Sequence, residues 1–66
     1  MTDFNINGLD FAATTINVVA KTAAAHDWFA RHIAQGAVSA TFHKSSAGAV
    51  LDSIRAAGLN YAQVAA

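Results

Sequence analysis

The chain has 66 residues, which is enough for one small domain and limits the core that it can bury. Apolar residues make up 55% of the sequence, cysteine and proline are absent, and four Lys or Arg residues balance four Asp or Glu residues. Without cysteine there can be no disulfide or thiolate metal site, and a balanced charge argues against direct nucleic-acid binding, which needs a basic excess.

No apolar run approaches the roughly 20 residues of a membrane-spanning helix. The N-terminal sequence MTDFNING also lacks the basic start and continuous apolar stretch of a signal peptide. We therefore expect a cytoplasmic protein without membrane attachment, a complete small gene product that forms a single domain over residues 1–66.

The segment FNINGLDF, residues 4–11, predicts a tight β-hairpin. An Asn-Gly dipeptide between alternating apolar residues is typical of a two-residue turn, because both turn positions need positive φ. This turn would pair Ile6 with Leu9 and Phe4 with Phe11, with all four side chains on one face. A loose N-terminal loop is the alternative.

Residues 14–21 are rich in β-branched side chains, which favours a strand with Ile16, Val18 and Ala20 on one face. The same residues can also be read at helical spacing. That alternative would join residues 9–35 into one long helix and make the protein mostly α-helical.

The segment that follows, up to Gly36, predicts an amphipathic helix. Thr22 is a good N-cap and precedes three alanines, and Gly36 suits the left-handed position that ends a helix. Asp27 and Arg31 lie four residues apart in the favourable order for a surface pair. One face of the helix would be apolar and buried, with Ala25, Trp28, Phe29, His32 and Ile33.

A second strand and helix follow the same plan. Residues 37–44 alternate between apolar and polar, with Val38, Ala40 and Phe42 inward. Ser45 or Ser46 would cap a helix whose buried stripe is Ala47, Val50, Leu51 and Ile54. Gly58 would end that helix, and residues 60–66 could add a short edge strand.

These elements predict an α+β fold: an N-terminal hairpin followed by strand, helix, strand, helix and, in one version, a last strand. Both helices would cover one face of a sheet of three to five strands. The two strand–helix units repeat after about 23 residues, and if their strands are parallel, both helix N-termini open at the same end of the sheet.

Parallel strands would bring together five polar residues at that end of the sheet. Ammonium groups beside free backbone N–H groups attract phosphate, carboxylate or an acidic side chain, which suggests a small-ligand or anion-binding protein. The simpler interpretation is that these residues only cap helices and end strands. The candidate anion or partner-binding residues are Lys21, Thr22, Lys44, Ser45 and Ser46.

The residue types offer little chemistry. His26 and His32 are six residues apart, so they do not lie on one helix face as a metal pair would. A hydrolytic trio can be drawn from Ser45 or Ser46 with His43 and Asp52, but no strained nucleophile turn or oxyanion hole is indicated. We therefore expect no enzyme, no metal and no cofactor.

The outer helix faces carry alanine where Lys and Glu are usual, and such small apolar surfaces permit close approach of another protein. Tyr61, near the end of the chain, could anchor an interface through an aromatic ring with a polar tip. We expect a protein partner, or self-association into a homodimer in which the chain is a structural subunit. The candidate interface residues are Ala30, Arg31, Ala34, Asp52, Ala56 and Tyr61.

The stretch VVAKTAAAHDWF, residues 18–29, resembles the opening of very small proteins from bacteria and their phages. Those proteins share a strand, a Lys-Thr junction, an alanine-rich helix start and a Trp-Phe pair, and the likeness covers about two-thirds of the chain. The resemblance implies a compact α+β fold and a phage-type inhibitor of host defence, of the anti-CRISPR kind, which acts in the host cytoplasm by occupying a protein surface. It defines no functional residue.

Overall fold

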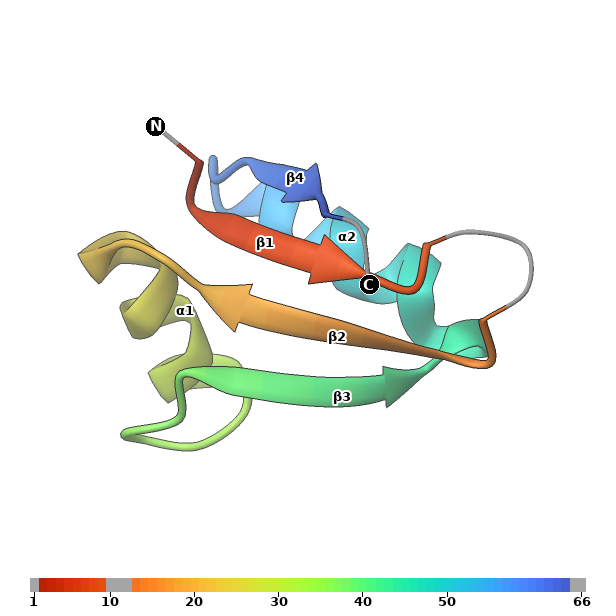
Figure 1. Ribbon diagram of the computed structural model, residues 1–66. Helices are drawn as coiled ribbons and strands as arrows, with labels where there is room; N and C mark the ends of the chain where they lie inside the picture. Colours follow the sequence, from red (N-terminus) through yellow and green to blue (C-terminus); the bar gives the residue numbers. More distant parts are fainter. Residues whose placement is uncertain (1, 10–12, 65–66) are drawn as a thin grey trace.

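The computed structural model describes residues 2–9 and 13–64, which form a four-stranded mixed sheet and two α-helices (Figure 1). The strands are β1 (Phe4–Asn7), β2 (Thr15–Ala20), β3 (Ser39–His43) and β4 (Tyr61–Gln63). The helices are α1 (Ala23–His32) and α2 (Ala47–Ala56), and a 3-10 turn, η1 (Lys44–Ser46), leads into α2. The predicted α+β fold is confirmed, and the mostly helical alternative is wrong because residues 15–20 are a strand.

The strands lie in the order β3-β2-β1-β4. β1 and β3 both pair with β2 in the antiparallel sense, whereas β4 pairs with β1 in the parallel sense. The two edges of the sheet are therefore β3 and the short strand β4. The return from β3 to β4 runs through α2 and crosses the two central strands (Figure 1).

The N-terminal hairpin exists, but its predicted register is wrong. Phe4 pairs with Ala20 and Ile6 pairs with Val18, so β1 and β2 are joined by a loop longer than two residues. The β-branched run of β2 offers β1 four paired positions, more than the three that the tight turn would give. The predicted partner Phe11 lies outside the described residues.

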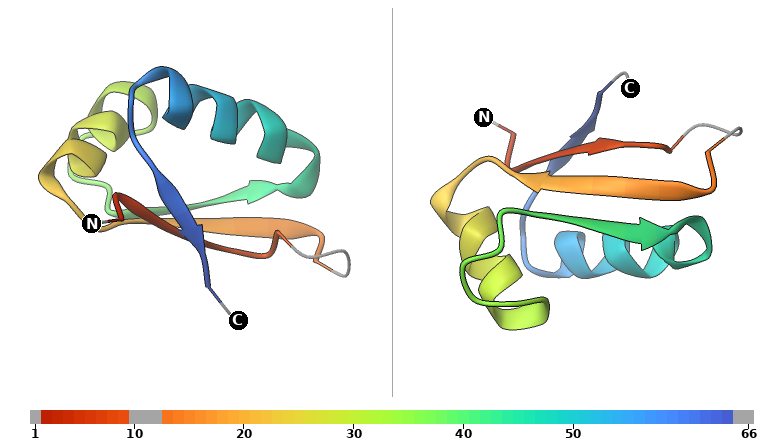
Figure 2. Two further views of the ribbon diagram at one scale, coloured as in Figure 1. Left: turned by 90° about the horizontal axis from the view of Figure 1, so that it is seen from above. Right: turned by 60° about the horizontal axis from the view of Figure 1, so that its bottom comes forward.

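Both helices lie on the same side of the sheet, and the core fills the space between the helices and the sheet (Figure 2). The alternation of each strand directs one row of side chains into that space. Within the described chain the buried apolar residues are Phe4, Ile6, Ile16, Val18, Ala20, Ala25, Trp28, Phe29, Ala47, Val50 and Ile54. The predicted inner faces of β2 and α2 are thus confirmed, with Leu51 partly buried against the core.

Helix α1 begins as predicted and ends earlier than predicted. The hydroxyl of Thr22 accepts a hydrogen bond from the backbone N–H of Ala25 at 3.2 Å, and the last helical residue is His32. The predicted burial of His32 and Ile33 is wrong: both are exposed, Ile33 by 41%. Because the chain leaves the helix at this point, Ile33 no longer faces the sheet.

Strand β3 and helix α2 follow the prediction with two exceptions. Val38 is 54% exposed because it precedes the strand, although Ala40 and Phe42 are partly buried as expected. Ser46 precedes α2 but its side chain makes no capping hydrogen bond. The end of α2 is as predicted, since Gly58 has a φ of +76° and the backbone N–H of Leu59 bonds back to the carbonyl of Ile54 at 3.1 Å.

Candidate functional site

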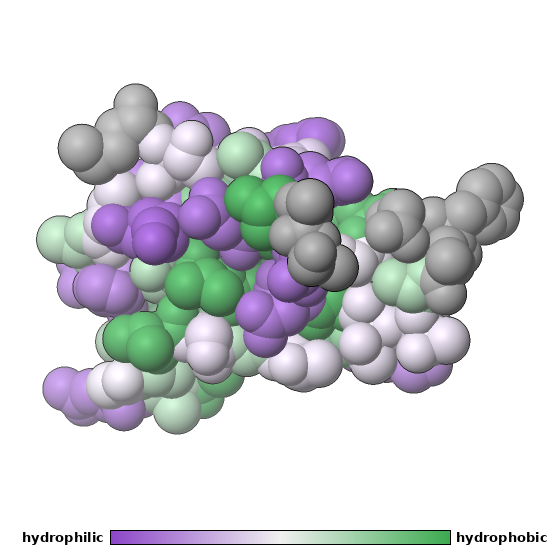
Figure 3. Space-filling view, viewed as in Figure 1, coloured by the Kyte–Doolittle hydropathy of each residue, from purple (hydrophilic) through white to green (hydrophobic). Residues whose placement is uncertain are grey.

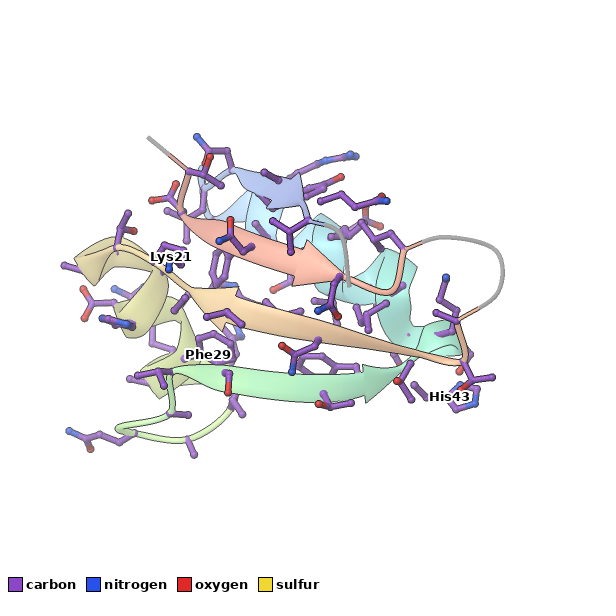
Figure 4. The ribbon with its side chains drawn as sticks, in the orientation of Figure 1. Lys21, Phe29 and His43 are labelled. Atoms are coloured by element: carbon purple, nitrogen blue, oxygen red, sulfur yellow. The ribbon has the colours of Figure 1, made fainter. Side chains whose placement is uncertain are left out.

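The structure does not bring together the polar residues that follow β2 and β3. Because these strands are antiparallel, the condition for a shared anion site is not met. Lys21 and Thr22 lie at one end of the sheet, and His43, which precedes Lys44, lies at the other (Figure 4). The six residues of β2 separate the two ends by about 20 Å, at roughly 3.3 Å per residue.

The N-terminus of α1 already has an anion, and the chain itself supplies it. The hydroxyl of Thr22 donates to Oδ1 of Asp3 at 2.7 Å, and the backbone N–H of Asn60 donates to Oδ2 at 3.1 Å. The backbone N–H of Asp3 in turn donates to Oδ1 of Asn60 at 2.8 Å. We call Asp3, Thr22 and Asn60 the latch, because they join β1, α1 and β4.

The hydrogen bond from Thr22 lowers the pKa of Asp3 below its ordinary value, and the bond from the Asn60 backbone lowers the pKa further. The carboxylate is thereby held in its charged form at the positive end of the α1 dipole. Thr22 thus has a structural role at this end of the helix.

The other end of the sheet is also engaged within the chain. Nδ1 of His43 accepts from the backbone N–H of Ser45 at 3.1 Å and lies 2.8 Å from the Ser45 hydroxyl. The ammonium group of Lys44 donates to the carbonyl of Gly8 at 2.6 Å. The His43–Ser45 contact caps η1, and no acidic side chain of the described residues contacts His43 to complete a catalytic trio.

The candidates predicted on the outer helix faces are at the surface, although Ala34 lies after the end of α1 and not on it. Their exposure agrees with the idea of an alanine-rich outer face but does not test binding. Tyr61 is half-buried, and its hydroxyl accepts a hydrogen bond from Arg55 at 2.8 Å. The exposed candidates are Ala30, Arg31, Ala34, Asp52 and Ala56.

A groove lies between α1 and the segment that connects α2 to β4. Its volume is about 170 Å³, and it is partly open to solvent. Ala57 and Leu59 form the wall across from the helix. The residues that α1 contributes recur at helical spacing, so that they share one side of the helix: Ala24, Asp27, Trp28, Arg31 and His32.

Four polar side chains line this groove, and none of them makes a hydrogen bond to another described residue. Neither Asp27 nor Arg31 has a side-chain partner among the described residues, and no ion pair links the two. The indole Nε1 of Trp28 is buried without a hydrogen-bond partner. The fourth, His32, stacks on Trp28, with ring centroids 4.9 Å apart and planes inclined by 34°.

An unpaired buried N–H is costly, because it loses its water and gains no acceptor in return. Aromatic packing holds the ring of Trp28 in place. Its ring meets Phe4 and Phe29 edge to face, with centroids 5.4 Å apart in both pairs. The ring is thus held by its aromatic neighbours beside a recess that is also lined by an acid, a guanidinium group and an imidazole.

One of these groove residues, Arg31, is among the interface candidates that the sequence predicts. Trp28 was assigned to the core, which is correct for most of its surface, since it is 5% exposed. The wall made by Ala57 and Leu59 was not foreseen, because it depends on how the chain returns after α2. The one signal of the groove in the sequence is the spacing of Asp27 and Arg31. From the sequence, these two residues are expected to pair with each other on the surface of the helix.

The described residues include no group of three or more His, Asp or Glu side chains placed to hold a metal ion. In the same residues, no helix has the length and apolar character needed to cross a membrane. Comparison with protein-family models, with curated proteins and with solved structures gave no match.

Proposed function

We propose that this chain is a non-enzymatic protein-binding module that receives one apolar side chain of a partner protein in the Trp28 groove. The observation that carries the proposal is that Asp27 and Arg31, beside that groove, have no side-chain partner among the described residues. In the latch and in the cap of η1, polar groups are bonded within the chain. Around the groove, the exposed side chains of Asp27 and Arg31 have no partner among the described residues and remain available to one.

The size of the groove favours a side chain over a free small molecule. Sites for small ligands and cofactors have volumes of about 300–1,000 Å³. The groove holds about 170 Å³, close to the volume of a single large aliphatic residue. It can therefore receive an anchor residue, the kind of contact that dominates the binding energy of protein interfaces.

The polar rim suits an extended peptide segment. Asp27 is an acceptor and Arg31 is a donor, and they lie one helical turn apart on the same side of α1. A peptide presents an N–H and a C=O on either side of each side chain. With the side chain in the groove, its N–H can donate to Asp27 and its C=O can accept from Arg31.

Selection from a displayed library of random peptides tests this proposal. We expect the selected peptides to share an apolar residue and to change the fluorescence of Trp28, the only tryptophan of the chain. Ala24→Leu, which fills the groove, should weaken binding about tenfold or more, since one lost anchor side chain is worth more than 1 kcal/mol.

Ala23→Leu is the matched control, because Ala23 is the exposed neighbour of Ala24 and does not line the groove. Peptides that bind Ala24→Leu and Ala23→Leu equally well would show that another surface is used. Failure to select any peptide above the background of Ala24→Leu would overturn the proposal.

The narrower form of the proposal is a phage-type inhibitor that occludes the surface of a host defence complex. The resemblance of residues 18–29 to small phage proteins supports it. Inhibition by occlusion needs no catalytic residues, and the sequence predicts none. The test is phage survival in a bacterial host with an active defence system. We expect Ala24→Leu to abolish protection while Ala23→Leu retains it, and equal protection by the two variants would count against the groove.

A further inference from the structure

We propose that the outer edge of β3 pairs with the same edge of a second copy of this chain, so that two four-stranded sheets join into one. β3 is the end strand of the sheet, with five residues in regular register and no bulge. The opposite edge, β4, has only three residues. The β3 edge is therefore the longer template for an additional strand.

The β3 edge lacks the devices by which proteins prevent such pairing. Edge strands are usually protected by lysine, proline, a bulge or a covering element. Residues 33–42 contain no charged side chain and no proline. In Figure 3, the border of the molecule along β3 is white and green between its two ends. Val38, just before the strand, is 54% exposed.

The hydrogen bonds to β2 determine which backbone groups are free on this edge. The backbone N–H of Ala20 donates to the carbonyl of Val38, and the N–H of Lys44 donates to the carbonyl of Thr14, both at 2.8 Å. Residues of an antiparallel strand alternate between the two sides. Residues 38, 40, 42 and 44 therefore face β2, and residues 39, 41 and 43 present their N–H and C=O groups outward.

A two-fold axis through Thr41 satisfies these outward groups. Thr41 then exchanges both hydrogen bonds with Thr41 of the second copy, as in any self-complementary interface. Ser39 lies opposite His43 of the second copy on the open face of the sheet. On the helix-covered face, the small Ala40 lies opposite Phe42 of the second copy, and no charged side chain meets a like charge.

A second copy of this chain is the partner that fits this edge best, because its own β3 edge has the same length and charge. The edge is neutral, so self-pairing causes no electrostatic repulsion. A chain of this size buries only about 60% of its unfolded surface, and self-association is a common way to supplement so small a core. Pairing would also cover Val38 and the exposed side of Phe42.

A single cysteine tests the geometry directly, because the natural chain has none. In Thr41→Cys the two thiols would meet at the two-fold axis, where paired Cα atoms are about 5.5 Å apart, within the range that a disulfide spans. We expect mild oxidation to give a covalent dimer. Ala49→Cys, exposed on α2, is the control and should cross-link about tenfold more slowly.

A charge exchange at the same position provides a second test. Thr41→Lys and Thr41→Asp should each be monomeric in sedimentation, and an equimolar mixture of the two should form a dimer. Thr41→Ser, which keeps the hydroxyl that accepts a hydrogen bond from Asn17 at 3.1 Å, should remain dimeric like the natural chain. Circular dichroism confirms that each variant is folded.

Three results would overturn this proposal. The first is a natural chain that stays monomeric at every concentration tested, in which case the edge is left for a strand of another protein. The second is a dimer that survives Thr41→Lys. The third is cross-linking of Thr41→Cys no faster than that of Ala49→Cys. None of these results bears on the Trp28 groove, which lies on another part of the molecule.

Discussion

Helix α1 carries two polar regions that differ in how their groups are used. At its N-terminus, the latch bonds the side chains of Asp3 and Thr22 and the backbone of Asn60 to one another. Along the side of the same helix, the charged groups of Asp27 and Arg31 face the groove and have no partner among the described residues. One region holds the fold together, and the other leaves its groups available.

This difference provides a way to separate structural from functional polar residues. A polar group that is bonded within the chain contributes to stability, and its removal should destabilise the fold. A polar group that stays unpaired beside a recess contributes little to stability, so its position is better explained by a partner. The two regions of α1 should therefore respond differently to mutation.

The largest expected effect comes from the core that supports both regions. Phe29 is fully buried beneath the sheet (Figure 4) and packs against Trp28 and Phe4. Phe29→Ala should lower the free energy of unfolding by about 3–5 kcal/mol, because it removes a buried ring and leaves a cavity. Urea denaturation followed by circular dichroism measures this change, and a loss below about 1 kcal/mol would contradict the packing.

Phe29→Leu is the control for that substitution, since it keeps most of the apolar volume. We expect it to cost about 1–2 kcal/mol. Both the latch and the groove should survive in this variant, whereas Phe29→Ala should weaken them together.

The next effect concerns the turn after β1. Gly8 has a φ of +89°, and a Cβ at this position would overlap the carbonyl oxygen of Thr15. Gly8→Ala should therefore cost about 2 kcal/mol or more, through the unfavourable φ together with the overlap. Gly36→Ala is the matched control, because Gly36 has a φ of +85° with open space around it. Its cost should be about 1 kcal/mol, and equal costs for the two variants would contradict the close approach.

Acid should weaken the latch. The folded state lowers the pKa of Asp3, chiefly through the hydrogen bond from Thr22. The unfolded chain then binds more protons than the folded chain at acidic pH, so this stabilisation is complete above the ordinary aspartate pKa of about 3.9 and is lost as the pH falls through the lower folded value.

Thermal unfolding of the natural chain and of Thr22→Val between neutral and acidic pH measures this contribution. The valine variant lacks the hydroxyl that lowers the pKa, so its melting temperature should fall less between these pH values. Parallel decreases in the two proteins would exclude the Thr22–Asp3 bond as the cause.

The sequence predicted most of the fold because its signals are local. The Thr22 cap, the Gly58 stop and the alternation in residues 15–20 and 39–43 each depend on neighbouring residues, and all agree with the structure. The pairing of the strands depends on residues far apart in the sequence. For that reason the register of β1 and the antiparallel sense of β2 and β3 were not foreseen.

The candidate site was harder to predict for the same physical reason. The groove exists because Ala57 and Leu59, on the segment after α2, come to lie beside α1. Nothing within residues 22–36 indicates that contact. An Asp and an Arg four residues apart are usually interpreted as a surface pair, and only the structure shows that both remain unpaired next to a tryptophan.

The smallest expected effect on stability is also the one that separates the two regions most clearly. Asp27→Ala and Arg31→Ala should each change the free energy of unfolding by no more than about 0.5 kcal/mol, because their side chains are exposed and have no partner in the part of the chain that the structure describes. The same variants should weaken a selected peptide about twofold to tenfold, the usual value of one hydrogen bond. His26→Ala, an exposed change on α1 away from the groove, should affect neither quantity.

If Arg31→Ala destabilises the fold as much as a change in the latch, the residue has a structural role. The groove would then lose the unpaired guanidinium group on which its proposed use as a peptide site depends.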